Sequence, residues 1–79
     1  MNTRDTVNSR ATLYGWRSHG APTHANYVKA DKCVQVDYST TGHITGAVRY
    51  RFFKLDDLRF EEATGTKHKK ETVLSWLAQ

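Results

Sequence analysis

The chain of 79 residues has one cysteine, one proline and no long run of apolar residues. The single cysteine, Cys33, has no second cysteine to pair with, so no internal disulfide supplements the packing of the core. No window approaches the roughly 18 consecutive apolar residues that a membrane-spanning helix needs, and the polar start MNTRDTVNSR is unlike a signal peptide. These absences predict a cytoplasmic protein with no membrane partner.

The sequence also lacks a catalytic or metal-binding pattern. The four histidines and Cys33 show no spacing that is typical of a metal site. The acidic pairs 56–57 and 61–62 are adjacent in sequence, so their side chains diverge and do not face one substrate as a general acid and base. We therefore expect a protein that is not an enzyme and that uses no cofactor and no metal.

Positive charge is in excess. The chain has 12 Lys and Arg against 8 Asp and Glu, which gives a formal net charge of +4 and an isoelectric point of about 9.5. Because Asp56, Asp57, Glu61 and Glu62 concentrate acidic charge in one stretch, the rest of the surface is more cationic than the net charge indicates. A basic surface of this kind favours a polyanionic partner such as nucleic acid.

A chain of this length is expected to form one domain with one small core. Residues 1–9 have a single aliphatic residue after the initiator, Val7, which predicts a flexible N-terminal arm. Residues 10–79 then form a single globular domain. Its size is typical of accessory proteins of phages and mobile elements.

The first half of the chain predicts strands. Residues 12–17, TLYGWR, are rich in β-forming residues, and SHGAPTH, residues 18–24, predicts the loop that follows. Residues 27–38 fit one long bent strand with an irregularity near Asp31 and Lys32, or two short strands. The single strand is preferred because no Gly or Pro separates its halves.

The clearest local pattern is a hairpin formed by CVQVDYS and HITGAVRYRFF. Apolar residues recur at every second position of both strands, so each strand has a buried side and a solvent side. Matching the two apolar sets excludes a two-residue turn at Thr41 and Gly42 and leaves a loop of three or five residues. The five-residue loop is preferred because it also pairs Asp37 with Arg49. The predicted buried set is Val34, Val36, Tyr38, Ile44, Val48, Tyr50 and Phe52.

The last third of the chain predicts a strand and a helix. Residues 54–63, KLDDLRFEEA, fit either a strand of a second hairpin or a short helix, and the strand is preferred. Val73, Trp76 and Leu77 have the spacing of an amphipathic helix, predicted from about Lys67 to Ala78. The predicted fold is therefore α+β, a small antiparallel sheet of four to five strands with the C-terminal helix packed on one face.

This arrangement predicts which side chains face solvent. If the helix covers Val48 and Tyr50, the two arginines between the apolar residues project from the opposite, open face of the sheet. Cations interleaved with aromatic rings suit single-stranded nucleic acid, although arginines on a solvated sheet face also simply cover apolar surface. The candidate nucleic-acid-binding residues on this face are Arg17, Tyr27, Lys29, Arg49 and Arg51.

A second basic cluster, TKHKKE, lies at the predicted start of the last helix. The helix dipole disfavours cations there, whereas free amide groups beside lysines form an anion site. Alternatively, the helix begins near Glu71 and the lysines belong to a solvated loop. Lys67, Lys69 and Lys70 complete the candidate nucleic-acid-binding residues.

Two functional classes fit these patterns. The first is a small basic binding module for nucleic acid or another polyanion. The alternative is an inhibitor or adaptor that binds a host protein complex through the acidic stretch 56–62 or an exposed sheet edge. An unprotected edge also predicts a homodimer formed by strand pairing.

Overall fold

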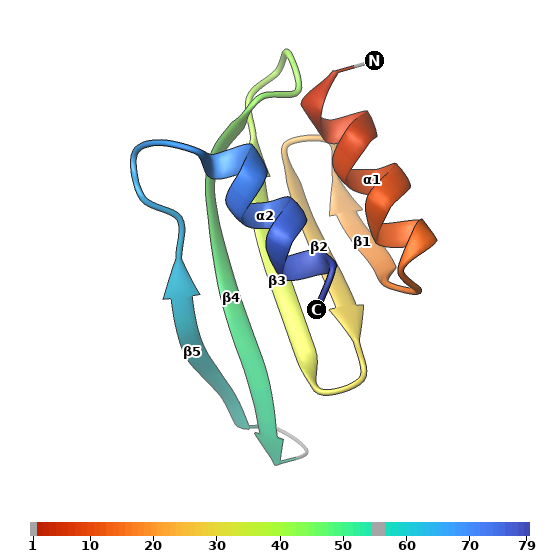
Figure 1. The fold of residues 1–79 in the computed structure, drawn as a ribbon, viewed down its shortest axis with the longest axis vertical. Helices are drawn as coiled ribbons and strands as arrows, with labels where there is room; N and C mark the ends of the chain where they lie inside the picture. The colour runs from red at the N-terminus through yellow and green to blue at the C-terminus, as the bar shows by residue number, and fades with distance from the viewer. Residues whose placement is uncertain (1, 55–56) are drawn as a thin grey trace.

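The computed structural model describes residues 2–54 and 57–79, and the side chains of all of these except 53, 54, 57 and 58. The chain forms helix α1 (Thr3–Leu13), strands β1 (Arg17–Ala21), β2 (His24–Lys29), β3 (Lys32–Tyr38), β4 (Ile44–Lys54) and β5 (Asp57–Ala63), and helix α2 (Lys69–Leu77). The five strands form one antiparallel sheet in chain order. Both helices lie on the same side of this sheet (Figure 1). The predicted α+β fold is confirmed, with the C-terminal helix on one face.

Helix α1 occupies the segment for which the sequence predicted a flexible arm. Asn2 caps this helix, because its side-chain oxygen accepts a hydrogen bond from the Asp5 backbone N–H at 2.9 Å. Val7 and Ala11 lie one turn apart and are buried in the core. The prediction of an arm was wrong because two buried residues are too few to produce an apolar stripe in the sequence.

The segment TLYGWR is not a strand. Thr12 and Leu13 finish α1, and strand β1 begins only at Arg17. Residues 18–24, predicted as a loop, form most of β1 and the start of β2, with Pro22 and Thr23 between the two strands.

Residues 27–38 form parts of two strands rather than one bent strand. A tight turn at Ala30 and Asp31 joins β2 to β3, and Lys29 pairs with Lys32 across it. Ala30 has φ of 53°, a left-handed conformation that usually requires glycine, so the sequence contained no turn signal here.

The β3–β4 hairpin has the predicted loop length and a different register. Tyr38 pairs with Ile44, so residues 39–43 connect the strands. The register then shifts, because Asp37 pairs with Gly46 and leaves Thr45 as an extra residue. A bulge of this kind moves every later side chain of β4 to the other face of the sheet.

This β-bulge corrects the predicted sidedness of β4. Val34 pairs with Arg49 on the helix side of the sheet, so Arg49 and Arg51 lie there and not on the open face. The predicted pair of Asp37 with Arg49 is not formed. The side chains that the alternation assigned to the core, Val48, Tyr50 and Phe52, lie on the open face instead, the face opposite α1 and α2.

The last two elements follow the prediction more closely. Strand β5 confirms a strand over residues 57–63, whereas residues 55 and 56 lie outside the described residues. Helix α2 begins two residues later than predicted, with His68 at its N-cap position. Val73, Trp76 and Leu77 are buried, as the spacing indicated.

The hydrophobic core fills the space between the sheet and the two helices. The indole N–H of Trp16 donates a hydrogen bond to the Leu77 carbonyl at 2.8 Å, which ties the segment after α1 to the end of α2. The core consists of Val7, Ala11, Trp16, Tyr27, Val34, Val36, Tyr38, Ala47, Val73, Trp76 and Leu77.

Candidate polyanion-binding surface

The strand register aligns four cationic residues in one row across the sheet. Lys29 pairs with Lys32, Lys32 with Arg51, and Arg51 with Arg59. Directly opposed residues of antiparallel strands share a face, so all four lie on the same side. Neighbouring strands are about 4.8 Å apart, which gives the row a length of roughly 14 Å. We call Lys29, Lys32, Arg51 and Arg59 the cation row.

The cation row lies on the helix side, beyond the end of α2. Tyr27 faces the helices, since its hydroxyl donates to Asn8 on α1, and Lys29 is two residues further along the same strand. Strands β3 and β4 extend past the end of α2 in this direction (Figure 1). The row is therefore next to the helices and is not covered by them.

The charges in the row are only partly neutralised. Arg51 Nε lies 3.0 Å from Glu61 Oε1, and 49% of the Arg51 side chain remains exposed. Lys32, half-buried, has no ion-pair partner among the described residues. Lys29 Nζ lies 5.9 Å from the centre of the Trp16 ring. Arg59 is exposed and also interacts within the chain.

Arg49 lies on the helix side of the sheet and packs against α2. Its guanidinium carbon lies 5.5 Å from the Trp76 ring centre, and its NH1 group donates to Gln79 Oε1 at 2.8 Å. It also pairs with Glu61 at 3.3 Å and with Glu62 at 3.1 Å. A register shift in β5 between these two glutamates places both beside Arg49. Arg49 is thus a structural cation and was wrongly assigned to the open face.

Tyr27 was also wrongly predicted to face solvent. The ring is fully buried, and its hydroxyl forms a hydrogen bond with the Tyr38 hydroxyl at 2.8 Å. Burial raises the pKa of Tyr27, and burial together with this hydrogen bond raises the pKa of Tyr38 well above its ordinary value. These phenols support the packing of α1 on the sheet and offer no ring to a ligand.

The remaining predicted site residues lie apart from the cation row. Arg17 is exposed and, because it pairs with Val28, projects on the open face. Lys67, Lys69 and Lys70 lie at the start of α2, the end away from the cation row. Of the eight predicted residues, only Lys29 and Arg51 come together in the row, and both lie on the helix side rather than on the predicted open face.

Two residues of the row, Lys32 and Arg59, were missed in the sequence. Lys32 was assigned to an irregularity of one strand, and Arg59 to a segment whose structure was ambiguous. A two-residue turn at Ala30 and Asp31 places Lys32 opposite Lys29, and the pairing of β4 with β5 places Arg59 opposite Arg51.

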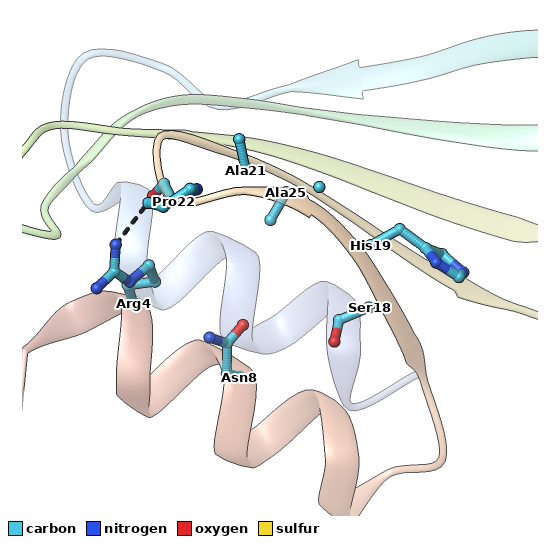
Figure 2. Close-up of a pocket in the computed structure, with 8 residues that line it drawn as sticks. Arg4, Asn8, Ser18, His19, Ala21, Pro22 and Ala25 are labelled. Atoms are coloured by element: carbon cyan, nitrogen blue, oxygen red, sulfur yellow. Dashed lines mark hydrogen bonds between the residues drawn. The ribbon is translucent and has the colours of Figure 1, made fainter.

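A groove lies between α1 and the β1–β2 hairpin, with a volume of about 320 Å³. Figure 2 shows Arg4 and Asn8 on α1 facing Ser18 and Ala25 on the strands. Two of its polar side chains already have partners within the chain, since Arg4 NH1 donates to the Pro22 carbonyl at 3.1 Å and Asn8 accepts from Tyr27. The groove is therefore weaker than the cation row as a candidate site.

The described residues contain no group of three or more His, Cys, Asp or Glu side chains that could hold a metal ion. None of the described helices is long and apolar enough to cross a membrane. Comparisons with protein-family models, with curated proteins and with solved structures find no match for this chain.

Proposed function

We propose that this protein is a small non-enzymatic domain that binds nucleic acid through the cation row. The observation that carries the proposal is the register alignment of Lys29, Lys32, Arg51 and Arg59 on one side of the sheet. Duplex DNA carries one negative charge per about 1.7 Å of its axis, so a row of roughly 14 Å meets several phosphates.

The chemistry of the row suits phosphates better than bases. Lys and Arg donate charge-assisted hydrogen bonds to phosphate oxygens, and Arg does so in a bidentate manner. On the side of the sheet that carries the row, Trp16, which lies beside Lys29, and Tyr27 are buried and offer no face for base stacking. Binding is therefore expected to depend on charge and only weakly on base sequence.

The alternative, an inhibitor or adaptor that uses the acidic stretch 56–62, has less support. Glu61 pairs with both Arg49 and Arg51, and Glu62 pairs with Arg49. These carboxylates are already neutralised within the chain, which leaves less acidic charge for a protein partner.

The proposal is tested by measuring oligonucleotide binding as a function of salt, with single-stranded and duplex probes. Each phosphate contact contributes about 0.7 (single strand) to 0.9 (duplex) to the slope of log affinity against log salt. Replacing Lys32 and Arg51 together with Ala is expected to weaken binding and to reduce the slope by about 1.4 to 1.8.

The matched control is Lys67→Ala with Lys70→Ala, which removes the same charge at the start of α2. It is expected to leave the slope nearly unchanged. Equal effects of the two double variants would show that net charge, and not the cation row, determines binding. Absence of binding at low salt would overturn the proposal itself.

A further inference from the structure

The open face of the sheet carries a broad apolar surface. Phe60 is 63% exposed, and its ring packs edge-to-face on Tyr50 with 6.2 Å between ring centres. Val28, Val48 and Phe52 lie on the same face and are each half-buried. An apolar patch of this extent on an otherwise polar domain indicates an interaction surface.

One row of directly paired residues crosses the open face from β1 to β5, and the chemical character of its side chains changes from one edge to the other. Arg17 pairs with Val28, Val28 with Cys33, Cys33 with Tyr50, and Tyr50 with Phe60. A cation therefore lies at the β1 edge, an aromatic pair at the β5 edge, and a small buried thiol on the central strand. Among these five residues only Arg17 is charged.

We propose that the open face binds the open face of a second copy of this chain, related by a two-fold axis parallel to β3. This axis exchanges the two edges of the sheet. Arg17 of one copy then lies over Phe60 of the other, Val28 lies over Tyr50, and the two Cys33 residues meet near the axis. The guanidinium stacks on the aromatic ring as a cation–π pair, and the apolar residues cover one another.

The alternative axis, perpendicular to the strands along this row, does not give this match. It stacks each strand on its own counterpart, so Arg17 approaches Arg17 of the other copy. Like charges at close range disfavour that arrangement. The order of residues in the row thus favours the axis parallel to β3 for the pairing of two copies.

In the neighbouring row, Gln35 lies on the central strand β3, between Asn26 and Val48. Under the proposed axis, Gln35 of the second copy lies over Gln35 of the first, so the two side-chain amides can hydrogen-bond across the axis. At the end of the face, His24 Nδ1 and Asp37 Oδ1 form an exposed pair at 2.6 Å, which suits the polar rim of an interface.

The area of the face is sufficient for a reversible dimer. The two longer extents of the molecule, 35 and 25 Å, lie in the plane of the sheet (Figure 1). A standard-size interface buries about 800 Å² per partner, which is on the scale of this outline. Two sheets packed face to face lie about 10 Å apart with their strands inclined by roughly 30°.

The first test is the mass of the protein in solution, measured by sedimentation from about 1 µM to about 1 mM. The mass is expected to rise from 9.0 kDa towards twice that value. Phe60→Glu is expected to raise the dissociation constant of the dimer by roughly thirtyfold or more. The matched control is Leu13→Glu, because Leu13 is 71% exposed on α1 and lies away from the open face.

Two outcomes overturn the proposal. One is a monomer at every concentration. The other is a dimer that survives Phe60→Glu, which would indicate pairing through a sheet edge. Circular dichroism establishes that the variant is folded. Because the cation row lies on the other side of the sheet, the Lys32→Ala, Arg51→Ala variant is expected to dimerise normally, which separates this proposal from nucleic-acid binding.

The orientation is tested by cross-linking in a Cys33→Ala background. Arg17→Cys protein mixed with Phe60→Cys protein is expected to form a cross-link between copies with a short bis-maleimide. Arg17→Cys protein alone is expected to form none, because its two thiols lie at opposite edges of the dimer. A cross-link in the second sample but not in the first would overturn the proposed axis.

Discussion

The guanidinium of Arg49 lies over the ring of Trp76, beneath the last helix of the chain. Only 21% of the Arg49 side chain is exposed, and Glu61, Glu62 and Gln79 bind its nitrogen atoms. This arginine therefore joins β4, β5 and α2. Its stacking on Trp76 also rules it out as part of an open, solvent-facing binding surface.

Replacing Arg49 with Ala is expected to lower the free energy of unfolding by about 1 to 3 kcal/mol, because two glutamates lose their shared cation next to Trp76. Urea denaturation measures the loss. Arg51→Ala is the control, since Arg51 is half-exposed and has one ion pair, and less than about 1 kcal/mol is expected. Equal losses in the two variants would contradict the structural role of Arg49.

Replacing Ala30 with Gly is expected to stabilise the protein. With φ of 53°, Ala30 occupies a left-handed conformation that costs an L-residue about 1 kcal/mol or more. Ala30→Gly should raise the free energy of unfolding by about 1 kcal/mol, measured by thermal or urea denaturation. Ala21→Gly should instead lower it, because Ala21 lies in β1 and does not itself have a positive φ.

Replacing Gly20 with any other residue is expected to lower the stability of the protein. Its φ is 124°, and an added Cβ atom would lie 2.2 Å from the His24 carbonyl oxygen. Gly20→Ala should cost at least about 2 kcal/mol, because the β1–β2 hairpin has to shift to admit the methyl group. Gly65→Ala is the control, since no atom lies within 4 Å of the added Cβ, and its unfolding midpoint is expected to stay close to that of the wild type.

Tyr27 and Tyr38 are expected to make the fold sensitive to alkali. Burial raises the pKa of both phenols above the unfolded value of about 10, so the unfolded state loses its protons first as pH rises. Stability from this source is fully present below about pH 10 and falls above it, by up to about 1.4 kcal/mol per pH unit for each phenol.

Absorbance at the tyrosinate band tests this expectation. Tyr27 and Tyr38 should ionise only together with unfolding, because burial raises the pKa of both phenols. Tyr38→Phe, which removes one of the two buried phenols, should reduce the loss of stability above pH 10. Ionisation of Tyr27 and Tyr38 before unfolding would contradict the buried hydroxyl pair.

The fold class and the last helix could be predicted because they depend on residues close together in sequence. Val73, Trp76 and Leu77 mark one side of α2, and each of them is buried. Helix α1 was missed because its burial rests on Val7 and Ala11 alone. The pattern of Asn2 three residues before Asp5, typical of a helix N-terminus, was the available signal.

The candidate site could not be predicted, because it depends on single-residue shifts of register. Thr45 is one extra residue in β4, and it exchanges the faces of Val48 and Arg49. Ala30 turns the chain in a conformation that its side chain disfavours, so Lys29 and Lys32 appeared to be neighbours in one strand. Alternation alone identifies which residues share a face, and only the register identifies which face that is.

The hydrogen bond from Trp16 to the Leu77 carbonyl brings one tryptophan of the chain to the end of the helix that contains the other. Both indoles are buried there, with Lys29 beside one and Arg49 beside the other. The intrinsic fluorescence of the two tryptophans therefore reports on the docking of α2, without an added dye. A red shift of the emission would accompany detachment of this helix even while the strands stay paired.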